Sequence, residues 1–212
     1  TRPSFPAILT SSHPLMYGGF ERISELRTLV SEVLVDEGYL TAGFHSNLYL
    51  SEDFGYGRGF TQFFDSKGDS SYTTKIRRYV KQRLNSDGLL FKLLDGLYHS
   101  TERKTGINVG SYHVSAEDIT EKALRWVEST NSQPKFLWVH YMDVHHPYLP
   151  PAEFQRHFRD DPVEKREAVK LRRKLIEHPG QITDAEFATM CDLYDAEIRF
   201  TDGQIKRLVE TA

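Results

Sequence analysis

Acid–base side chains gather directly after the most apolar segment of the sequence. Residues 136–142 read Phe-Leu-Trp-Val-His-Tyr-Met, and Asp143, His145 and His146 follow directly. An imidazole can give or take a proton near neutral pH, and a carboxylate accepts hydrogen bonds. These three side chains are therefore candidates for contact with a substrate or ligand.

The surroundings of this cluster leave two interpretations open. Pro147, Pro150 and Pro151 restrict the loop, which suits a site that must be held in place. Strand alternation puts His140 inside the strand, where a histidine can simply be a buried structural residue. The residues alone support a functional loop and a structural one equally.

A second candidate lies at the start of the sequence, where Thr1 and Ser4 flank Pro3. Proline suits the first turn of a helix because its missing N–H costs no hydrogen bond there. A hydroxyl at that place lies beside free N–H groups and the positive end of the helix dipole, which favour a bound anion. Thr and Ser are also common helix caps, so the spacing leaves both roles open.

Helical and extended patterns alternate along the chain. Helical spacing of apolar residues predicts six helices, over 3–10, 23–37, 73–99, from 115–118 onward, over 151–178, and from 183–186 to the end. Apolar runs rich in β-formers predict strands over 40–44 and 136–142, the second at the centre of a sheet. Long loops are expected over 51–72 and 100–114.

This order is typical of an α/β protein with three layers, α/β/α, whose ligand sites lie at the carboxyl ends of the strands. In the last helix, one apolar stripe is expected to be buried: Phe187, Met190, Leu193, Tyr194, Ile198, Ile205 and Leu208.

The bulk composition limits the possible partners. The 212 residues suffice for one α/β domain, and the net charge of −3 argues against a nucleic-acid partner. No apolar stretch is long enough to predict a membrane span. The single cysteine, Cys191, allows no intrachain disulfide, which favours a reducing compartment.

Five segments, in order, resemble the sulfatase family of the alkaline phosphatase superfamily. Residues 1–18 resemble its nucleophile segment, and 38–42 resemble its Gly-Tyr-x-Thr-Ala strand entry. Residues 57–63 resemble its Gly-Phe-Asp-x-Phe loop, and 136–151 its Asp-x-His-x-Pro-Tyr segment. Residues 194–202 resemble its helix Tyr-Asp-x-Glu-Ile-x-x-x-Asp.

The resemblance implies a fold, a reaction and a set of site residues. The fold is an alkaline-phosphatase-like α/β/α sandwich, and a hydroxyl nucleophile bound to a divalent cation attacks a small-molecule sulfate or phosphate ester. Thr1 occupies the nucleophile and metal-ligand position, and His145 the position of a catalytic histidine. The implied cation is calcium, manganese or zinc. Substrate ligands are expected at four positions: His45, Asn47, Asp143 and His146.

Three departures from the family pattern keep alternatives open. Thr1 stands where sulfatases carry the Cys or Ser that is oxidised to formylglycine, and Phe5 replaces the motif's Arg. The family's remaining acidic ligands and its Asp-His pair fall outside this sequence. We therefore read residues 1–212 as one sulfatase-like catalytic domain, incomplete at both ends. Three functions remain: a sulfate ester hydrolase, a phosphodiesterase or phosphoryl-transfer enzyme using Thr1 directly, and a non-catalytic binder of anions or partners.

Overall fold

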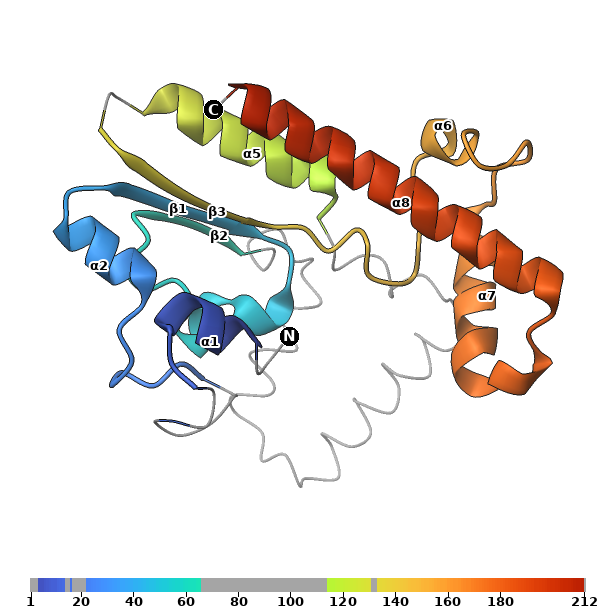
Figure 1. The fold of residues 1–212 in the computed structure, drawn as a ribbon, viewed down its shortest axis with the longest axis horizontal. Coiled ribbons are helices and arrows are strands. Elements are labelled where there is room, and N and C mark those ends of the chain that lie inside the picture. Colours follow the sequence, from blue (N-terminus) through green and yellow to red (C-terminus); the bar gives the residue numbers. More distant parts are fainter. Residues whose placement is uncertain (1–3, 14–15, 17–21, 66–113, 131–132, 212) are drawn as a thin grey trace, which may run out of the picture. The chain divides into compact units, whose positions relative to one another are not determined.

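A computed structural model describes residues 4–13, 16, 22–65, 114–130 and 133–211 (Figure 1). They fall into two compact units. The sheet unit comprises the described residues of 1–67, 113–143 and 200–212, and the helical unit comprises residues 144–199. Thr1, the helix expected over 73–99 and nearly all of the loop expected over 100–114 lie outside the described residues.

Three parallel strands form the centre of the sheet unit. Strand β1 (Leu40–His45) pairs with β2 (Gln62–Asp65) on one side and with β3 (Lys135–His140) on the other. Among the described strands β1 is therefore the middle one, whereas the sequence placed residues 136–142 at the centre. The two predicted strands are confirmed within two residues at each end.

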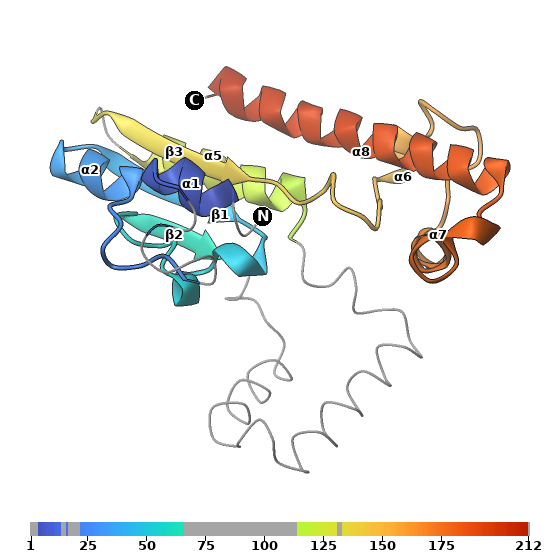
Figure 2. The same cartoon turned by 60° about the horizontal axis from the view of Figure 1, so that its bottom comes forward.

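Helices cover both faces of this sheet (Figures 1 and 2). On one face lie α1 (Ser4–Thr10) and α2 (Val30–Asp36), and their side of the sheet carries the apolar cluster of Leu9, Ile23, Leu29, Leu50 and Tyr56. On the other face lie α5 (Ala116–Ser129) and the last turns of α8 (Asp184–Thr211), around Ala42, Phe44, Ile119, Ala123 and Trp126. The predicted three-layer α/β/α arrangement is confirmed.

The helix predicted over 23–37 is confirmed only from Val30 onward. The segment before it forms hydrogen bonds with other parts of the chain in place of helical ones. Ile23 N donates to Phe54 O, and Nε of buried Arg27 donates to Met16 O at 3.0 Å. Leu29 then opens α2, with its N–H donating to the Glu32 carboxylate at 2.8 Å. Tertiary contacts of Arg27 therefore replace the first two turns of the expected helix.

The loop expected over 51–72 contains structure that the sequence did not reveal. Two short 3₁₀ turns, η1 (Leu48–Leu50) and η2 (Glu52–Phe54), lead into β2. A strand of four residues carries too little periodicity to distinguish it from a loop. Thr41 ties this connection down, since its hydroxyl donates to Gly59 O at 2.7 Å.

The helical unit departs from the sequence pattern at one break. The helix expected over 151–178 is divided into α6 (Ala152–Gln155) and α7 (Lys165–Glu177), followed by η4 (Pro179–Gln181). Buried Gln155 holds the connection, because its Oε1 accepts from Val163 N at 2.7 Å and its Nε2 donates to Pro150 O. Pro162, with no N–H to donate, lies inside the break.

Helix α8 begins as predicted, with Thr183 and Glu186 bonding each other's backbone N–H. Its predicted buried stripe is wrong for four residues that are 41–59% exposed: Phe187, Tyr194, Ile198 and Ile205. Leu193 is buried, and the buried face continues through residues that include polar ones: Ala196, Glu197, Phe200, Thr201 and Gln204. The helix is thus rotated relative to its most apolar stripe because polar side chains such as Glu197 bond inside. No helix within the described residues is long and apolar enough to span a membrane.

Substitution of Gly59 tests the close packing of its backbone against α2. Its φ of 70° is left-handed, and an added Cβ would lie 2.6 Å from Glu32 Cα in α2. Gly38 has a similar φ of 83° but open space around it. We expect Gly59→Ala to lower the free energy of unfolding by about 3 kcal/mol or more, and Gly38→Ala by about 1 kcal/mol. Urea denaturation of both variants checks this, and equal losses would contradict the packing described.

Candidate active site

The carboxyl edge of the sheet brings three polar residues into one row. In the parallel register His45 stands opposite Asp65 on one side and His140 on the other. The loops that carry Asn47 and Asp143 leave the sheet from this edge, which is where α/β proteins place their ligand sites. Strand pairing therefore gathers several of the predicted site residues, although they lie far apart in sequence.

His45 lies inside the sheet unit at this edge. Its side chain is fully buried, with ring centroids 5.0 Å from Phe63 and 5.6 Å from Trp138. These aromatic rings enclose the imidazole beneath α1. A direct role of His45 on the substrate stays a prediction.

Asn47 is held by its own turn. It is 3% exposed, and its Oδ1 accepts from Tyr49 N at 3.0 Å, which caps η1. Its Nδ2 lies 3.4 Å from Nε2 of His140. The amide group thus faces the end of β3 in a fixed orientation, while its contact with a substrate remains untested.

His140 joins this edge although the sequence favoured a purely structural role for it. Burial lowers its pKa to about 4, so the ring is neutral at neutral pH. Phe5 of α1 packs edge-on against it, with ring centroids 4.7 Å apart, and also contacts Trp138 at 6.1 Å. The sequence placed His140 inside a strand predicted over 136–142, and only the structure shows that β3 ends at this residue.

Phe5 therefore connects α1 to the sheet through apolar contact. Sulfatases carry an Arg at this position of the motif they share with residues 1–18. Here a ring packs between α1 and β3, beside an uncharged imidazole. Any charge that steadies a ligand near the start of α1 must come from another residue.

Asp143 ties the loop after β3 back to α5, the helix that precedes this strand. Its Oδ1 accepts from Ala116 N, at the start of α5, at 2.9 Å. Its Oδ2 is buried and has no hydrogen-bond partner among the described residues. Burial raises the pKa of this carboxyl, so a charged Asp143 is held at a cost to stability, which is common at functional sites.

His145 and His146 belong to the helical unit. Their rings stack with centroids 4.4 Å apart, and Nδ1 of His145 lies 2.8 Å from the carbonyl oxygen of His146. Since a carbonyl oxygen only accepts, Nδ1 carries the proton of this hydrogen bond and donates it to His146. The His145 side chain is exposed, and the His146 ring is half-buried with its pKa lowered by burial.

The loop behind the two histidines is anchored to α8. Glu197, 4% exposed, accepts from Leu149 N at 2.6 Å, and the rings of Tyr148 and Tyr194 lie 5.1 Å apart. Tyr148 and Leu149 also pack against the cluster of Val163, Ala168 and Leu193. The histidines thus stand on a loop held by both a hydrogen bond and apolar packing.

The implied cation has no complete site in the described part of the chain. No three His, Cys, Asp or Glu side chains among those residues lie close enough to hold a metal ion. Thr1, the predicted metal ligand, lies outside the described residues. The divalent cation therefore stays a prediction from the family pattern.

Comparison with known proteins identifies the family. The family model described as Sulfatase matches residues 1–212, so the chain belongs to the sulfatase family. No curated protein matches this sequence.

A similar solved structure is the phosphonate monoester hydrolase of Agrobacterium radiobacter, with a TM-score of 0.55 and 14% sequence identity. The match covers 99% of this chain and 49% of that one, so the chain spans about half the length of that hydrolase. At this identity the likeness concerns the fold, which is that of the predicted alkaline-phosphatase-like class.

Two substitutions at Asp143 test its buried charge. Asparagine keeps an oxygen to accept from Ala116 N and removes the charge, whereas alanine removes both. At pH 7 we expect Asp143→Asn to be at least as stable as the parent and Asp143→Ala to lose about 1 kcal/mol.

The difference in stability between Asp143→Asn and the parent protein should depend on pH. Because the folded-state pKa is raised, the wild-type carboxyl contributes less to stability as pH rises through its titration range. The advantage of Asn over Asp should therefore shrink as pH falls. Denaturant unfolding at several pH values measures this, and an Asn variant less stable than the Ala variant at pH 7 would disprove it.

Proposed function

We propose that the protein is a hydrolase that cleaves a sulfate ester, with Thr1 as the nucleophile and His145 acting on the substrate. The observation that carries the proposal is the match of the sulfatase family model to all 212 residues. The hydroxyl at position 1 stands where that family carries its nucleophile, and His145 stands where it carries the histidine of the Asp-x-His-x-Pro segment.

His145 suits the task of binding an oxygen of the ester and protonating the departing alcohol. Its side chain is exposed on an anchored loop, and the bond from Nδ1 to the carbonyl of His146 fixes both the ring plane and the tautomer. An imidazole held in one orientation is what a general acid requires. The stacked ring of His146 supports this orientation.

The other predicted substrate ligands differ in how well each could contact the substrate. Asn47 is fixed at the carboxyl edge of the sheet and can donate through its amide. Asp143 is committed through one oxygen to α5, which suits positioning of the loop. His45, enclosed by aromatic rings, fits a supporting place behind the site better than one at its surface.

A divalent cation, in this proposal calcium, manganese or zinc, supplies charge to lower the pKa of the nucleophile's hydroxyl and to balance the ester's anionic oxygens. Since the described residues do not form its site, its ligands beyond Thr1 are left to the rest of the protein.

Phe5 favours a second candidate, a phosphodiesterase or phosphoryl-transfer reaction of the same superfamily. Threonine and the apolar contact of Phe5 with His140 together suit an unmodified hydroxyl. In that reaction the Thr1 oxygen forms a bond to phosphorus while the alcohol leaves with a proton. Water or an acceptor alcohol then breaks the Thr1–phosphorus ester in a second displacement.

A third candidate is a non-catalytic binder of an anion or partner. The replacement of the motif's Arg by Phe5 keeps it open, because a binder has no need to hold a nucleophile. The metal content of the purified full-length protein separates it from both enzymes, since a binder needs no catalytic cation.

Turnover of matched esters tests the first two candidates. We expect the full-length protein to hydrolyse an aryl sulfate with a higher kcat/KM than an aryl phosphodiester; the reverse order would favour the second candidate. Thr1→Val should lower kcat at least about a thousandfold on either ester. Thr28→Val, at an exposed position of the sheet unit, is the matched control. Equal rates for Thr1→Val and Thr28→Val would exclude Thr1 as the nucleophile.

His145→Ala should lower kcat by about 10²–10³, the usual loss for one positioned donor. His157→Ala replaces another exposed histidine of the helical unit and should leave kcat unchanged. Steady-state kinetics of the full-length variants measures both. An unchanged kcat for His145→Ala on a good substrate would remove His145 from the reaction.

A further inference from the structure

A pocket lies within the helical unit beside the histidine loop, and His146, whose ring stacks on that of His145, is part of its wall. Its volume is about 280 Å³, and it is bounded by α7, by α8 and by the loop from His146 to Tyr148. Most of its wall is apolar, from Pro147, Ala168, Leu171, Leu175, Ile176, Met190 and Leu193. Ile176 is 57% exposed, so the pocket opens to solvent.

Two nitrogen-bearing side chains interrupt this apolar wall, Arg172 and His146. Nε of Arg172 is buried and has no hydrogen-bond partner among the described residues. Burial lowers the pKa of Arg172, and it also lowers that of His146, as do the charges of His145 and Arg172. The guanidinium and the imidazole are thus close enough to repel each other when both are charged.

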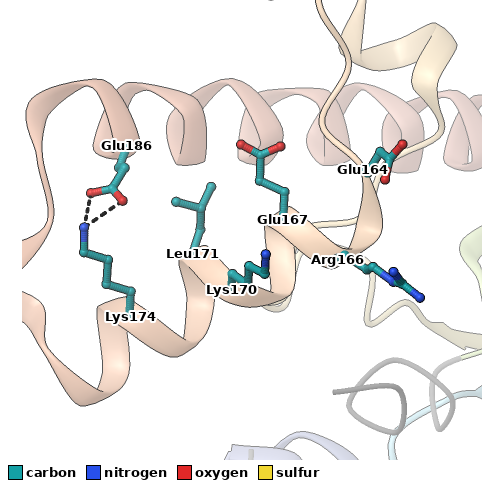
Figure 3. A pocket seen from close by; sticks show the side chains of 7 residues that line it. All are labelled: Glu164, Arg166, Glu167, Lys170, Leu171, Lys174 and Glu186. Atoms are coloured by element: carbon teal, nitrogen blue, oxygen red, sulfur yellow. Dashed lines mark hydrogen bonds and ion pairs between the residues drawn. The ribbon is translucent and has the colours of Figure 1, made fainter. Parts of the chain in front are cut away.

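On the opposite side of α7, basic side chains lie beside acidic ones (Figure 3). There, a pocket of about 510 Å³ is lined by three basic and three acidic side chains together with Leu171. Lys174 points at Glu186, with its Nζ 2.6 Å from Oε2, and Glu167 extends toward α8. The acids on that side balance its cations, whereas no Asp or Glu among the described residues lines the Arg172 pocket.

We propose that the pocket beside Arg172 binds a small organic anion, with an aryl ring or short alkyl chain against the apolar wall and the negative charge between Arg172 and His146. An anion there gives the buried Nε an acceptor and relieves the repulsion between the two side chains. The volume suits one substituted ring, because a cavity of about 150 Å³ already admits benzene.

This inference goes beyond ester hydrolysis, because it requires binding and no bond cleavage. The probes are therefore compounds that a hydrolase cannot cleave. Benzenesulfonate carries both the ring and the charge, methanesulfonate carries the charge without the ring, and benzyl alcohol carries the ring without the charge. Isothermal titration calorimetry of the full-length protein measures the affinity of each.

Benzenesulfonate is expected to bind at least tenfold more tightly than either of the other probes. Arg172→Gln should weaken benzenesulfonate binding at least tenfold and leave benzyl alcohol binding unchanged. Arg166→Gln removes the same charge from an exposed position of the same helix, on the other pocket, and should change neither.

A second variant, at the pocket mouth, tests binding in case Arg172→Gln fails to fold. Ile176→Glu adds a charge at an exposed position, so the fold should be retained while benzenesulfonate binding is lost and benzyl alcohol binding persists. Equal affinities of wild-type protein for benzenesulfonate and methanesulfonate would overturn the proposal. An equal effect of Arg172→Gln and Arg166→Gln on benzenesulfonate would overturn it as well. Ester hydrolysis by a protein that fails these binding tests would leave the proposed function standing without this pocket.

Discussion

Parallel pairing of β1 with both of its neighbours determines where the other parts of the sheet unit can lie. The register sets Asp65, His45 and His140 side by side at the carboxyl edge. It also aligns the aromatic side chains beneath α1, so that Phe5 rests on Trp138 and His140. A shift of one residue would turn these rings to the opposite face and would leave α1 without its contact.

The contact of Phe5 has a chemical consequence. It holds α1 against the sheet by packing, next to an imidazole that burial keeps neutral. A sulfatase motif with Arg would place a fixed charge there. This protein instead has an apolar ring at that place. In the proposed reaction, that ring suits a threonine that acts as an ordinary hydroxyl.

Local interactions explain which parts of the fold the sequence could predict. Strands β1 and β3 have continuous apolar runs, and the Thr183–Glu186 box fixes the start of α8 through bonds within one turn. The failures came from distant partners. Arg27 bonds Met16, eleven residues away in sequence, and Gln155 bonds Val163 across a break that helical spacing could not show. In α8 buried Glu197 bonds Leu149, which outweighs the more apolar stripe through Tyr194 and Ile198.

For the candidate site as well, the sequence predicted local features and missed contacts between residues far apart in sequence. Residue type and loop position were enough to single out His145, His146 and Asp143 as candidates, whereas Asn47 was expected only from the family resemblance. The place of His140 beside Asn47 and the exposure of Arg172 to an apolar pocket needed the three-dimensional arrangement. No spacing in the sequence connects residues 93 positions apart, as Asn47 and His140 are.

The central claim is that the hydroxyl of Thr1, and not that of Ser4 in the first turn of α1, attacks the ester. The most direct test is to quench the full-length protein in acid during turnover of an aryl sulfate and an aryl phosphodiester, and to map the covalent adduct by peptide mass spectrometry. The account predicts a sulfuryl or phosphoryl group on Thr1. An adduct on Ser4, with Thr1 unmodified, would contradict it.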